Sequence, residues 1–552
     1  MIKKFFMKNY FLLSIIIFNH WLLAQTDEDV IRYSNIGIGG TTRFLGLSGA
    51  MNALGGDISC ASYNPAGLGL MIRGDLNFSF GLNFANTISQ FNQNTEKKFS
   101  PALTFNFLGI SGVGIDKKNL NNRYTFAITL NQIQNFNQQI QIKGRPTGGK
   151  SITLDMIDYA KGKPYNKLDP LYEGMAYNIY VIDMLDTNNF NSYYSYIDTS
   201  KSFLQQQQIS KSGRINDLNF SFAYVFDDKV YLGATLAIPF LKFAYTSDYA
   251  EIDDQNQMYI VKDTGNTYVS SYPYTVYYYS GLGGIKDFHY QTTYTTTATG
   301  INLKVGAIWR TSDYFRLGVY YHSPTWYKAK DIYAYTFISN WDEGESYTAT
   351  VPDGGGLYNY RIVTPSKLGV AMSGIVSNIM SVNAEYEMID YTQGILKSSD
   401  VGVFDNANKA IKEKYKLSGN LRTGIELNTK PVMFRIGWAS YGSPFGNQIT
   451  GDYVRNAFSL GLGFKTTNFY YDFAIIKTFS NKQTYYMYNP KYSDVSNIRL
   501  NLTQIVFTIG LIGNRYDDNI DVEKYNNQNK NNPPSNTTEP NHNNNNKSVI
   551  PY

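Results

Sequence analysis

Few residues of this chain have the types and spacing that covalent chemistry requires. Cys60 is the single cysteine, so no disulfide can form within the chain. His322 and Ser323 are adjacent, and neighbouring residues of a strand point to opposite faces, so they do not form a nucleophile–base pair. The sequence holds no cluster of metal-ligand spacing and no glycine-rich phosphate-binding motif. These observations predict a protein without enzyme activity, metal or cofactor.

Two arginines are candidates for binding a ligand rather than for catalysis. Arg422 and Arg435 lie in alternating segments, where parity places them on the polar face. If the ligand carries a carboxylate head group, a cation on that face would contact it. The alternative for both residues is structural pairing with acids of the same face.

The elements that must position these residues are β-strands. Leu76, Phe78, Phe80, Leu82 and Phe84 alternate with small or polar residues, which is the period of a half-buried strand. The pattern recurs in about fourteen segments, counted by the usual strand criteria. These segments lie near 73–88, 99–115, 122–138, 213–226, 229–246, 291–310, 314–336, 357–376, 379–391, 416–427, 432–442, 454–464, 469–480 and 497–511. The last segment switches parity near Thr503-Gln504, which predicts a β-bulge there.

The connections between these segments alternate in length. Every second one is a short polar turn, such as Asp227-Asp228, and those between are mostly long, including 337–356. Residues 139–212 and 247–290 form the longest of these predicted extracellular loops. This alternation is typical of bacterial outer-membrane barrels. The fold class is therefore all-β: a transmembrane antiparallel β-barrel over residues 73–513, with about fourteen strands.

Composition agrees with a membrane barrel. Aromatic residues make up 16% and charged residues only 17% of the chain, against roughly 25% charged in soluble proteins. The net charge is +5, with no basic cluster, and this argues against nucleic acid as a partner.

The two ends of the chain differ from the strand region. Residues 1–24 have a basic start, an apolar run and a small residue, Ala24, as a signal peptide does; a short membrane anchor is the alternative. This export signal and the barrel pattern predict the outer membrane of a Gram-negative bacterium. Residues 526–552 are rich in asparagine and predict a disordered tail.

Residues 25–72 precede the first strand and lack its alternation. Glycines recur there, and Pro65 restricts the backbone at Asn64. Irregular backbone is tolerated at membrane depth when protein surrounds it. We therefore expect an N-terminal hatch, or plug, in the barrel lumen, with a loose periplasmic leader as the alternative.

One loop segment has helical rather than strand spacing. Leu168, Leu171, Tyr172, Met175, Ile179 and Ile182 recur at that spacing, which predicts an amphipathic helix over 168–184 in an outer loop. It either packs on the barrel rim or offers a surface that captures a ligand.

The run TTRFLGLSGAMNALGGDISCASYNPAGLGL resembles the N-terminal hatch of FadL-type outer-membrane transporters, which carry long-chain fatty acids and other hydrophobic compounds. Asn64, Pro65, Ala66 and Gly67 carry the match, and the resemblance continues at 364–393 and 421–445. It implies a fourteen-stranded barrel, passive uptake, gating by the hatch and lateral release into outer-membrane lipid. It also implies an inward kink in the third strand, where Asn131-Gln132 break the alternation. A simple bulge is the alternative at that point.

Two other functions remain open from the sequence. Some FadL-like barrels resemble scaffolds or shuttles for secreted proteins rather than transporters. The long outer loops and the asparagine-rich tail are compatible with a secreted protein or its secretion machinery as a partner. A haem receptor needs an axial ligand, and the mature chain offers His289, His322 and His542. Their isolated positions make haem the weaker alternative.

Overall fold

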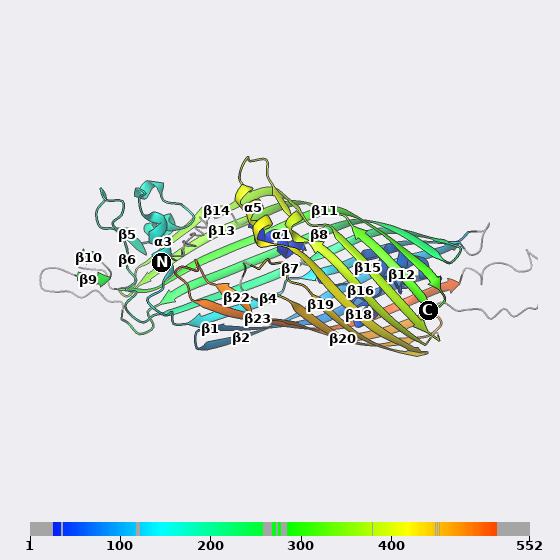
Figure 1. Ribbon diagram of the computed structural model, residues 1–552. Helices are drawn as coiled ribbons and strands as arrows, with labels where there is room; N and C mark the ends of the chain where they lie inside the picture. Colours follow the sequence, from blue (N-terminus) through cyan, green and yellow to red (C-terminus); the bar gives the residue numbers. More distant parts are fainter. Residues whose placement is uncertain are drawn as a thin grey trace, which may run out of the picture.

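The computed structural model is a closed antiparallel β-barrel whose lumen contains the N-terminal segment (Figure 1). The structure describes residues 26–34, 37–116, 122–257, 268–271, 274–277, 284–377, 379–447, 449, 451 and 453–515. The expected signal peptide, 1–24, and the expected tail, 526–552, lie outside the described residues. No helix in the described part of the chain has the length and hydropathy to cross a membrane.

Fourteen strands form the wall, three of them interrupted and therefore given two labels. They are β1 (Arg73–Phe91), β2 (Asn94–Ile115), β3 (Arg123–Asn135) with β4 (Gln138–Gly144), β7 (Leu204–Phe226), β8 (Val230–Ile252), β11 (Ile285–Ser312), β12 (Phe315–His322) with β13 (Trp326–Trp341), β14 (Ser346–Val363) with β15 (Lys367–Val376), β16 (Met380–Asp390), β18 (Leu417–Thr429), β19 (Val432–Tyr441), β20 (Arg455–Lys465), β21 (Phe469–Ser480) and β23 (Val495–Arg515). Consecutive strands pair antiparallel, and β1 pairs with β23 to close the barrel. The predicted all-β, fourteen-stranded barrel is confirmed.

An apolar band surrounds the barrel next to the short turns. On β7, Phe220, Phe222 and Phe226 point outward with 41–46% of their surface exposed. Beyond Leu218, the outward positions of β7 become polar. A closed barrel leaves no backbone group unpaired in lipid, and a band of this kind is what lipid contacts. The chain is an outer-membrane barrel, and its strands continue past the membrane on the long-loop side.

The wall is higher on one side than on the other (Figure 1). Strands β7, β8 and β11 have 23, 23 and 28 residues, whereas β16 and β19 have 11 and 10. Residues 337–356 were expected to form a long loop but instead form the tip of the tall β13–β14 hairpin. The long alternating strands pair there because their inner faces remain buried above the membrane.

Two helices lie where the wall is low. Helix α1 (Asp27–Ser34) contacts α5 (Asp405–Lys414), and Lys414 Nζ donates to Asp27 Oδ2 at 3.1 Å. Val30 and Tyr33 of α1 are buried in an apolar cluster with residues of the wall and of α5. The short strand β17 (Ile395–Lys397) pairs with the lower end of β14 beside them.

Two further expectations need correction. No bulge occurs at Thr503-Gln504, because β23 keeps continuous register there with both β1 and β21. The parity switch instead marks the level at which the outer face becomes polar and the inner face becomes apolar, as the strand leaves the membrane. The helix expected over 168–184 is also wrong in extent: α4 covers only Glu173–Asn178. Tyr172, with φ −138° and ψ −96°, and Tyr180, with φ 59°, both lie outside the helical region, so the helix ends between them.

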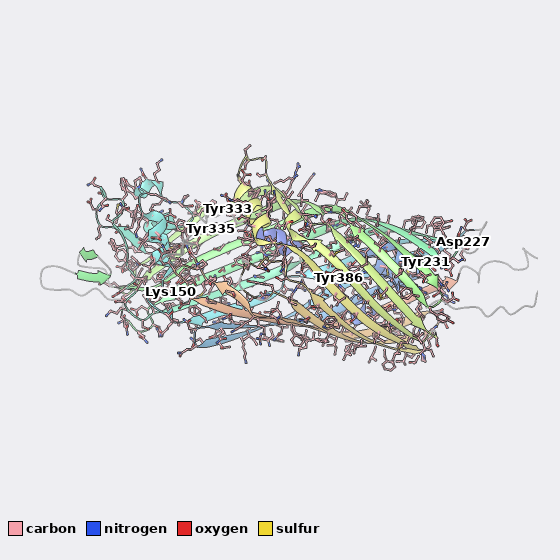
Figure 2. The ribbon with its side chains drawn as sticks, viewed as in Figure 1. Lys150, Asp227, Tyr231, Tyr333, Tyr335 and Tyr386 are labelled. Carbon is pink, nitrogen blue, oxygen red and sulfur yellow. The ribbon has the colours of Figure 1, made fainter. Side chains whose placement is uncertain are left out.

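The outer loops nevertheless bury the side chains that suggested that helix. Leu168, Met175, Ile179 and Ile182 join α3 (Ile152–Ala160) in a large apolar cluster inside the tall wall. The loop also contains η3 (Tyr165–Lys167) and the hairpin of β5 (Ile182–Met184) and β6 (Tyr193–Ser195). A second outer hairpin joins β9 (Tyr268–Ser271) to β10 (Tyr274–Tyr277), and β22 (Gln483–Tyr486) pairs with β23. We refer to residues 145–203, which include Lys150 (Figure 2), as the cap.

Candidate functional site

The plug consists of three short helical elements that the sequence caps locally. Thr41 caps α2 (Thr42–Gly46), Asp57 caps η1 (Ile58–Ser62), and Asn64 caps η2 (Pro65–Leu70), each through a side-chain oxygen. Pro65 occupies the first position of η2, where its missing N–H costs nothing. These caps explain why a glycine-rich segment adopts one ordered shape without strands.

The Asn-Pro-Ala-Gly motif docks directly against the barrel wall. Asn64 Nδ2 donates to the Asn52 carbonyl at 2.6 Å, and Ala66 N donates to Asn64 Oδ1 at 3.2 Å. A Cβ atom added to Gly306 of β11 would lie 1.9 Å from Asn64 Oδ1, and one added to Gly233 of β8 would lie 2.3 Å from the Pro65 carbonyl carbon. Glycine is therefore required in the wall where the motif meets it. The motif is an anchoring point of the plug.

The motif's last residue, Gly67, serves packing within the plug. Gly67 O accepts from Gly56 N at 2.9 Å. A Cβ atom at Gly67 would lie 2.6 Å from the Sγ atom of Cys60, which is fully buried. The chain's only thiol is thus enclosed at the centre of the plug.

A buried charge network attaches the plug to the opposite wall. Arg43 of the plug binds both carboxylate oxygens of Glu426 at 2.8 and 2.9 Å. Arg435 donates to Glu426 at 2.7 Å and to Asp472 at 2.6 Å, and its side chain is 1% exposed. The sequence predicted Arg435 as a possible head-group contact. In the structure its guanidinium instead lies between Glu426 and Asp472 and donates hydrogen bonds to both.

A second network contains the other arginine. Arg422 donates to Glu385 at 2.6 Å and to Glu387 at 2.7 Å, and Glu385 also accepts from Asn52 of the plug at 2.7 Å. Tyr320 completes the network through a 2.6 Å bond to Glu385. Unlike Arg435, Arg422 also lines a cavity.

The third strand of the wall is interrupted close to the residues where the sequence placed a kink. Pairing between β2 and β3 ends at Phe107–Asn131, and the register of β3 on β7 shifts between Gln132 and Gln134. Beyond the break, β4 pairs with β7 alone among the described strands. The kink and bulge interpretations both have a counterpart here, since a register shift accompanies the departure of the strand.

Strand β4 lies on the inner side of the wall. Gln138 Nε2 donates to Thr87 Oγ1 of β1 at 3.4 Å, and Ser89 Oγ of β1 donates to the Gln141 carbonyl. Toward β2, Gln139 N donates to Ser100 Oγ at 3.1 Å. We call the boundary between residues 94–106 of β2 and residues 132–144 the β2–β4 seam. Among the described residues a single hydrogen bond, to the Ser100 side chain, joins the two sides of this seam in place of a backbone ladder.

The plug touches this seam at its inner end. A Cβ atom at Gly39 would lie 2.0 Å from the Gln132 carbonyl oxygen, and Gly37 N donates to Gln134 Oε1 at 3.4 Å. Gly37 and Gly39 therefore lie along the break in the strand.

A narrow polar cavity lies beside the same segment. Its lining includes Tyr33, Gly37 and Ile133, and, on the wall, Lys304, Lys367 and Arg422. Lys304 pairs with Asp217, and Arg422 pairs as described above. Lys367, at the start of β15, has no ion-pair partner among the described residues. The lining also contains the acids Asp217 and Glu387, which form ion pairs with Lys304 and Arg422.

The histidines occupy unrelated places. His322 lines the cavity but donates from Nε2 to the Tyr63 carbonyl at 2.6 Å. His289 lies beyond the membrane, where its Nδ1 donates to Asp248 at 3.0 Å, a bond that raises the pKa of the imidazole. His542 lies outside the described residues. Within the described residues no group of His, Cys, Asp or Glu could hold a metal ion.

Sequence reasoning did not find the residues of the wall that receive the plug. Gly233, Gly306 and Lys367 had no local signal, because each acquires its role from a segment far away in the chain. The only available hint was the presence of glycines on the inner parity of long strands.

Comparison with known proteins adds structural relatives but no sequence family. No family model and no curated protein matches the chain. The structure is similar to that of a Pseudomonas aeruginosa FadL homologue, with 13% identity, a TM-score of 0.49, and coverage of 87% of this chain and 99% of that chain. It is also similar to the P. putida toluene transporter TodX, with 11% identity, a TM-score of 0.45, and coverage of 86% and 98%. For the Ralstonia pickettii toluene transporter TbuX, identity is 15%, the TM-score 0.42, and coverage 87% and 99%.

The decisive observation is the closed fourteen-stranded wall around a plug that carries Asn-Pro-Ala. This architecture agrees with the one that the resemblance to FadL-type transporters implies. In this barrel the cavity, residues 37–40 and the β2–β4 seam lie next to one another, and together they form the candidate site.

Proposed function

We propose that this FadL-type barrel is a passive channel that takes hydrophobic compounds, such as long-chain fatty acids, across the outer membrane. The observation that carries the proposal is the β2–β4 seam, a part of the wall without a backbone ladder, next to a cavity and a plug segment. A ladder contributes about one hydrogen bond for every residue that must separate, whereas only the bond from Gln139 N to Ser100 Oγ crosses the seam among the described residues. Apolar molecules could leave sideways there into lipid without entering the periplasm.

The route begins on the cap. Tyr165, Tyr180, Leu185 and Phe190 of the cap are 36–55% exposed, and such side chains suit capture of an apolar molecule. The route continues past α1 to the cavity and then to Ile133, which lines the cavity and lies in the break of β3.

A polar head group would bind in the cavity rather than at Arg435. Lys367 supplies an unpaired ammonium, and Arg422 behind it is held by two glutamates. This arrangement favours a ligand with an anionic or hydrogen-bonding end. TodX and TbuX carry the name of toluene transporters, and a purely apolar ligand of that kind would not use Lys367.

Gating belongs to the segment before the plug. The Asn64–Gly67 motif is buried against the wall, whereas Gly37 and Gly39 border the seam and the cavity. We propose that the motif anchors the plug and that residues 26–40 move away from the seam during passage.

A cross-link across the seam tests the function. Cysteines at Ser100 and Gln139, in a Cys60→Ser background, would join the two sides when oxidised. Uptake of a radiolabelled long-chain fatty acid by cells that express the variant should stop on oxidation and return on reduction. The control joins Thr336 to Thr350, whose exposed hydroxyls lie 3.2 Å apart in the outer β13–β14 hairpin. Equal uptake with the seam open or cross-linked would refute lateral release.

Mass spectrometry of molecules that copurify with the barrel tests the ligand class. A bound fatty acid that is lost in Lys367→Gln would support the head-group contact. An apolar ligand retained in that variant would refute the role of Lys367 but not the channel.

A further inference from the structure

A row of cations crosses the outer surface of the tall wall. Its members point outward from neighbouring strands and are exposed. They are Arg214 on β7, Lys242 on β8, Lys328 and Lys330 on β13, Arg361 on β14 and Lys397 on β17. We call these six residues the basic row.

Strand register places like charges directly opposite each other. Lys328 lies opposite Arg361, and Arg361 lies opposite Lys397. Arg214 lies opposite Lys242. Like charges at such positions destabilise a sheet unless an anion lies between them.

The chain supplies no such anion at these positions. Lys330 faces Thr297 and Asn359 across its two ladders, and Lys242 faces Thr297. None of the six cations has an ion-pair partner among the described residues, although twenty ion pairs occur elsewhere in them. No carboxylate therefore lies directly opposite Lys330 or Lys242 in these ladders to neutralise its charge.

The basic row lies immediately beyond the apolar band. Phe240 precedes Lys242 on the outer face of β8, and Trp326 precedes Lys328 on β13; they are 44% and 51% exposed. An exposed tryptophan at this point marks the membrane–water interface. The row therefore lies at the level of the lipid head groups on the long-loop side.

The opposite wall has a different composition at the end of its apolar band. The outer faces of β19 and β20 end at Ser440 and Asn456, which are paired with each other, and β21 offers the single cation Lys477. Farther along the wall, β23 and β2 carry the exposed cations Arg499 and Lys97, both opposite Ile88 of β1, so the basic row differs from the rest of the wall in its number of adjacent cations.

We infer that the basic row binds the phosphate groups of the phosphorylated glycolipid in the outer leaflet. Phosphate is the anion that head groups place at this height, and lysine and arginine side chains bind it by charge-assisted hydrogen bonds. Guanidinium and ammonium groups on adjacent strands, with like charges directly opposite, form a site for a doubly phosphorylated head group rather than for an isolated charge. This inference does not depend on the proposed transport activity.

The test uses a fourfold variant, Lys328→Gln, Lys330→Gln, Arg361→Gln and Lys397→Gln, in the full-length barrel. Native mass spectrometry would count molecules of bisphosphorylated lipid A that bind the detergent-solubilised protein. Binding should weaken at least about tenfold, since each basic residue at an anionic surface adds affinity. Lipid A without phosphates, which has the same acyl chains, should bind the native barrel and the variant equally weakly.

A matched control removes the same charge elsewhere. Lys167, Lys201, Lys409 and Lys412 are exposed and lie outside the basic row, in the cap and on α5, and their change to Gln should leave lipid A binding unaltered. Heat-modifiable migration on gels confirms that both variants form the closed barrel. The inference is overturned if the fourfold variant of the row binds like the native protein, if the control loses binding equally, or if phosphate-free lipid A binds the native barrel as tightly.

Discussion

The close contact between Gly306 of the wall and Asn64 of the plug predicts that a methyl group added at Gly306 will loosen the plug. In Gly306→Ala, the new methyl group would lie 1.9 Å from Asn64 Oδ1 and 2.9 Å from its Cγ. Ordinary contacts lie beyond about 3.4 Å, so the plug must shift by more than 1 Å or deform the wall. Overpacking of this kind costs about 1–3 kcal/mol. Because β11 keeps its ladders, we expect this cost to fall on docking of the plug.

The chain contains its own probe of that docking. Cys60 is the only cysteine and is fully buried in the plug. Its reaction with a maleimide therefore requires local opening, and the rate reports the free energy of that opening. We expect Gly306→Ala to accelerate labelling about 5- to 150-fold. Gly374→Ala is the control, because its added methyl group would lie 3.9 Å from the Val382 carbonyl oxygen, an ordinary contact.

A double-mutant cycle tests the cause. Asn64→Ala removes two hydrogen bonds and should itself accelerate labelling, since a buried polar group left unpaired costs about 1–3 kcal/mol. It also removes the atoms that clash, leaving Pro65 Cδ at 3.4 Å. Adding Gly306→Ala to Asn64→Ala should therefore change the rate less than about twofold. If Gly306→Ala labels at the native rate, or if its effect is equally large without the Asn64 side chain, the reasoning is refuted.

Three other perturbations have expected outcomes. Arg43→Met breaks the buried ion pair with Glu426, which costs about 3–5 kcal/mol. It should therefore accelerate labelling of the Cys60 thiol by more than Gly306→Ala does. A native labelling rate would show that Arg435 alone neutralises Glu426 and that the Arg43 pair does not hold the plug. Gly39→Val should raise fatty-acid uptake, because its side chain would displace the segment from the Gln132 carbonyl, and unchanged uptake would argue against gating there. Burial acts to raise the pKa of Asp494 in the outer loop, but hydrogen bonds from Lys150, Asn92 and Thr147 outweigh it and lower the pKa. The stability that Asp494 gives the cap is thus complete above its unfolded-state pKa of about 3.9 and is lost as pH falls through the lower folded value. Amide hydrogen exchange at residues 145–151 should accelerate as the pH falls through that acidic range. In Asp494→Asn the exchange should already be fast at neutral pH and should no longer accelerate on acidification. If the variant keeps the native dependence of exchange on pH, Asp494 does not stabilise the cap.

The wall of the barrel could be predicted from sequence because its cause is local. Alternation such as Leu76 to Phe84 depends only on which face meets lipid, and each predicted segment has its strand. The same rule failed at Thr503-Gln504, because above the membrane the apolar side of a strand turns inward. Alternation also did not predict the interruptions at Pro324, between β12 and β13, and at Pro365, between β14 and β15.

The site was harder to predict, because its contacts join distant parts of the chain. The Asn-Pro-Ala motif was recognisable, but its partners Gly233 and Gly306 lie more than 160 residues away. Charge and parity identified Arg422 and Arg435 as inward-facing but could not show that each guanidinium forms ion pairs with two acidic residues. Lys367 had no pattern to distinguish it, since an unpaired cation is recognised only when its surroundings are known.

The unequal height of the wall has a consequence for how an oily molecule reaches the protein. Fourteen residues of β7, 204–217, extend beyond the apolar band, which at about 3.3 Å per residue and a tilt near 40° raises the rim by roughly 35 Å. The sugar-rich coat of the cell surface repels oily solutes from the membrane beneath it. A rim of that height opens within or above this coat, so a molecule can enter from the medium without dissolving in the hydrated layer. Under the proposed function, the tall side of the barrel would thus shorten the path that an oily molecule travels through this coat.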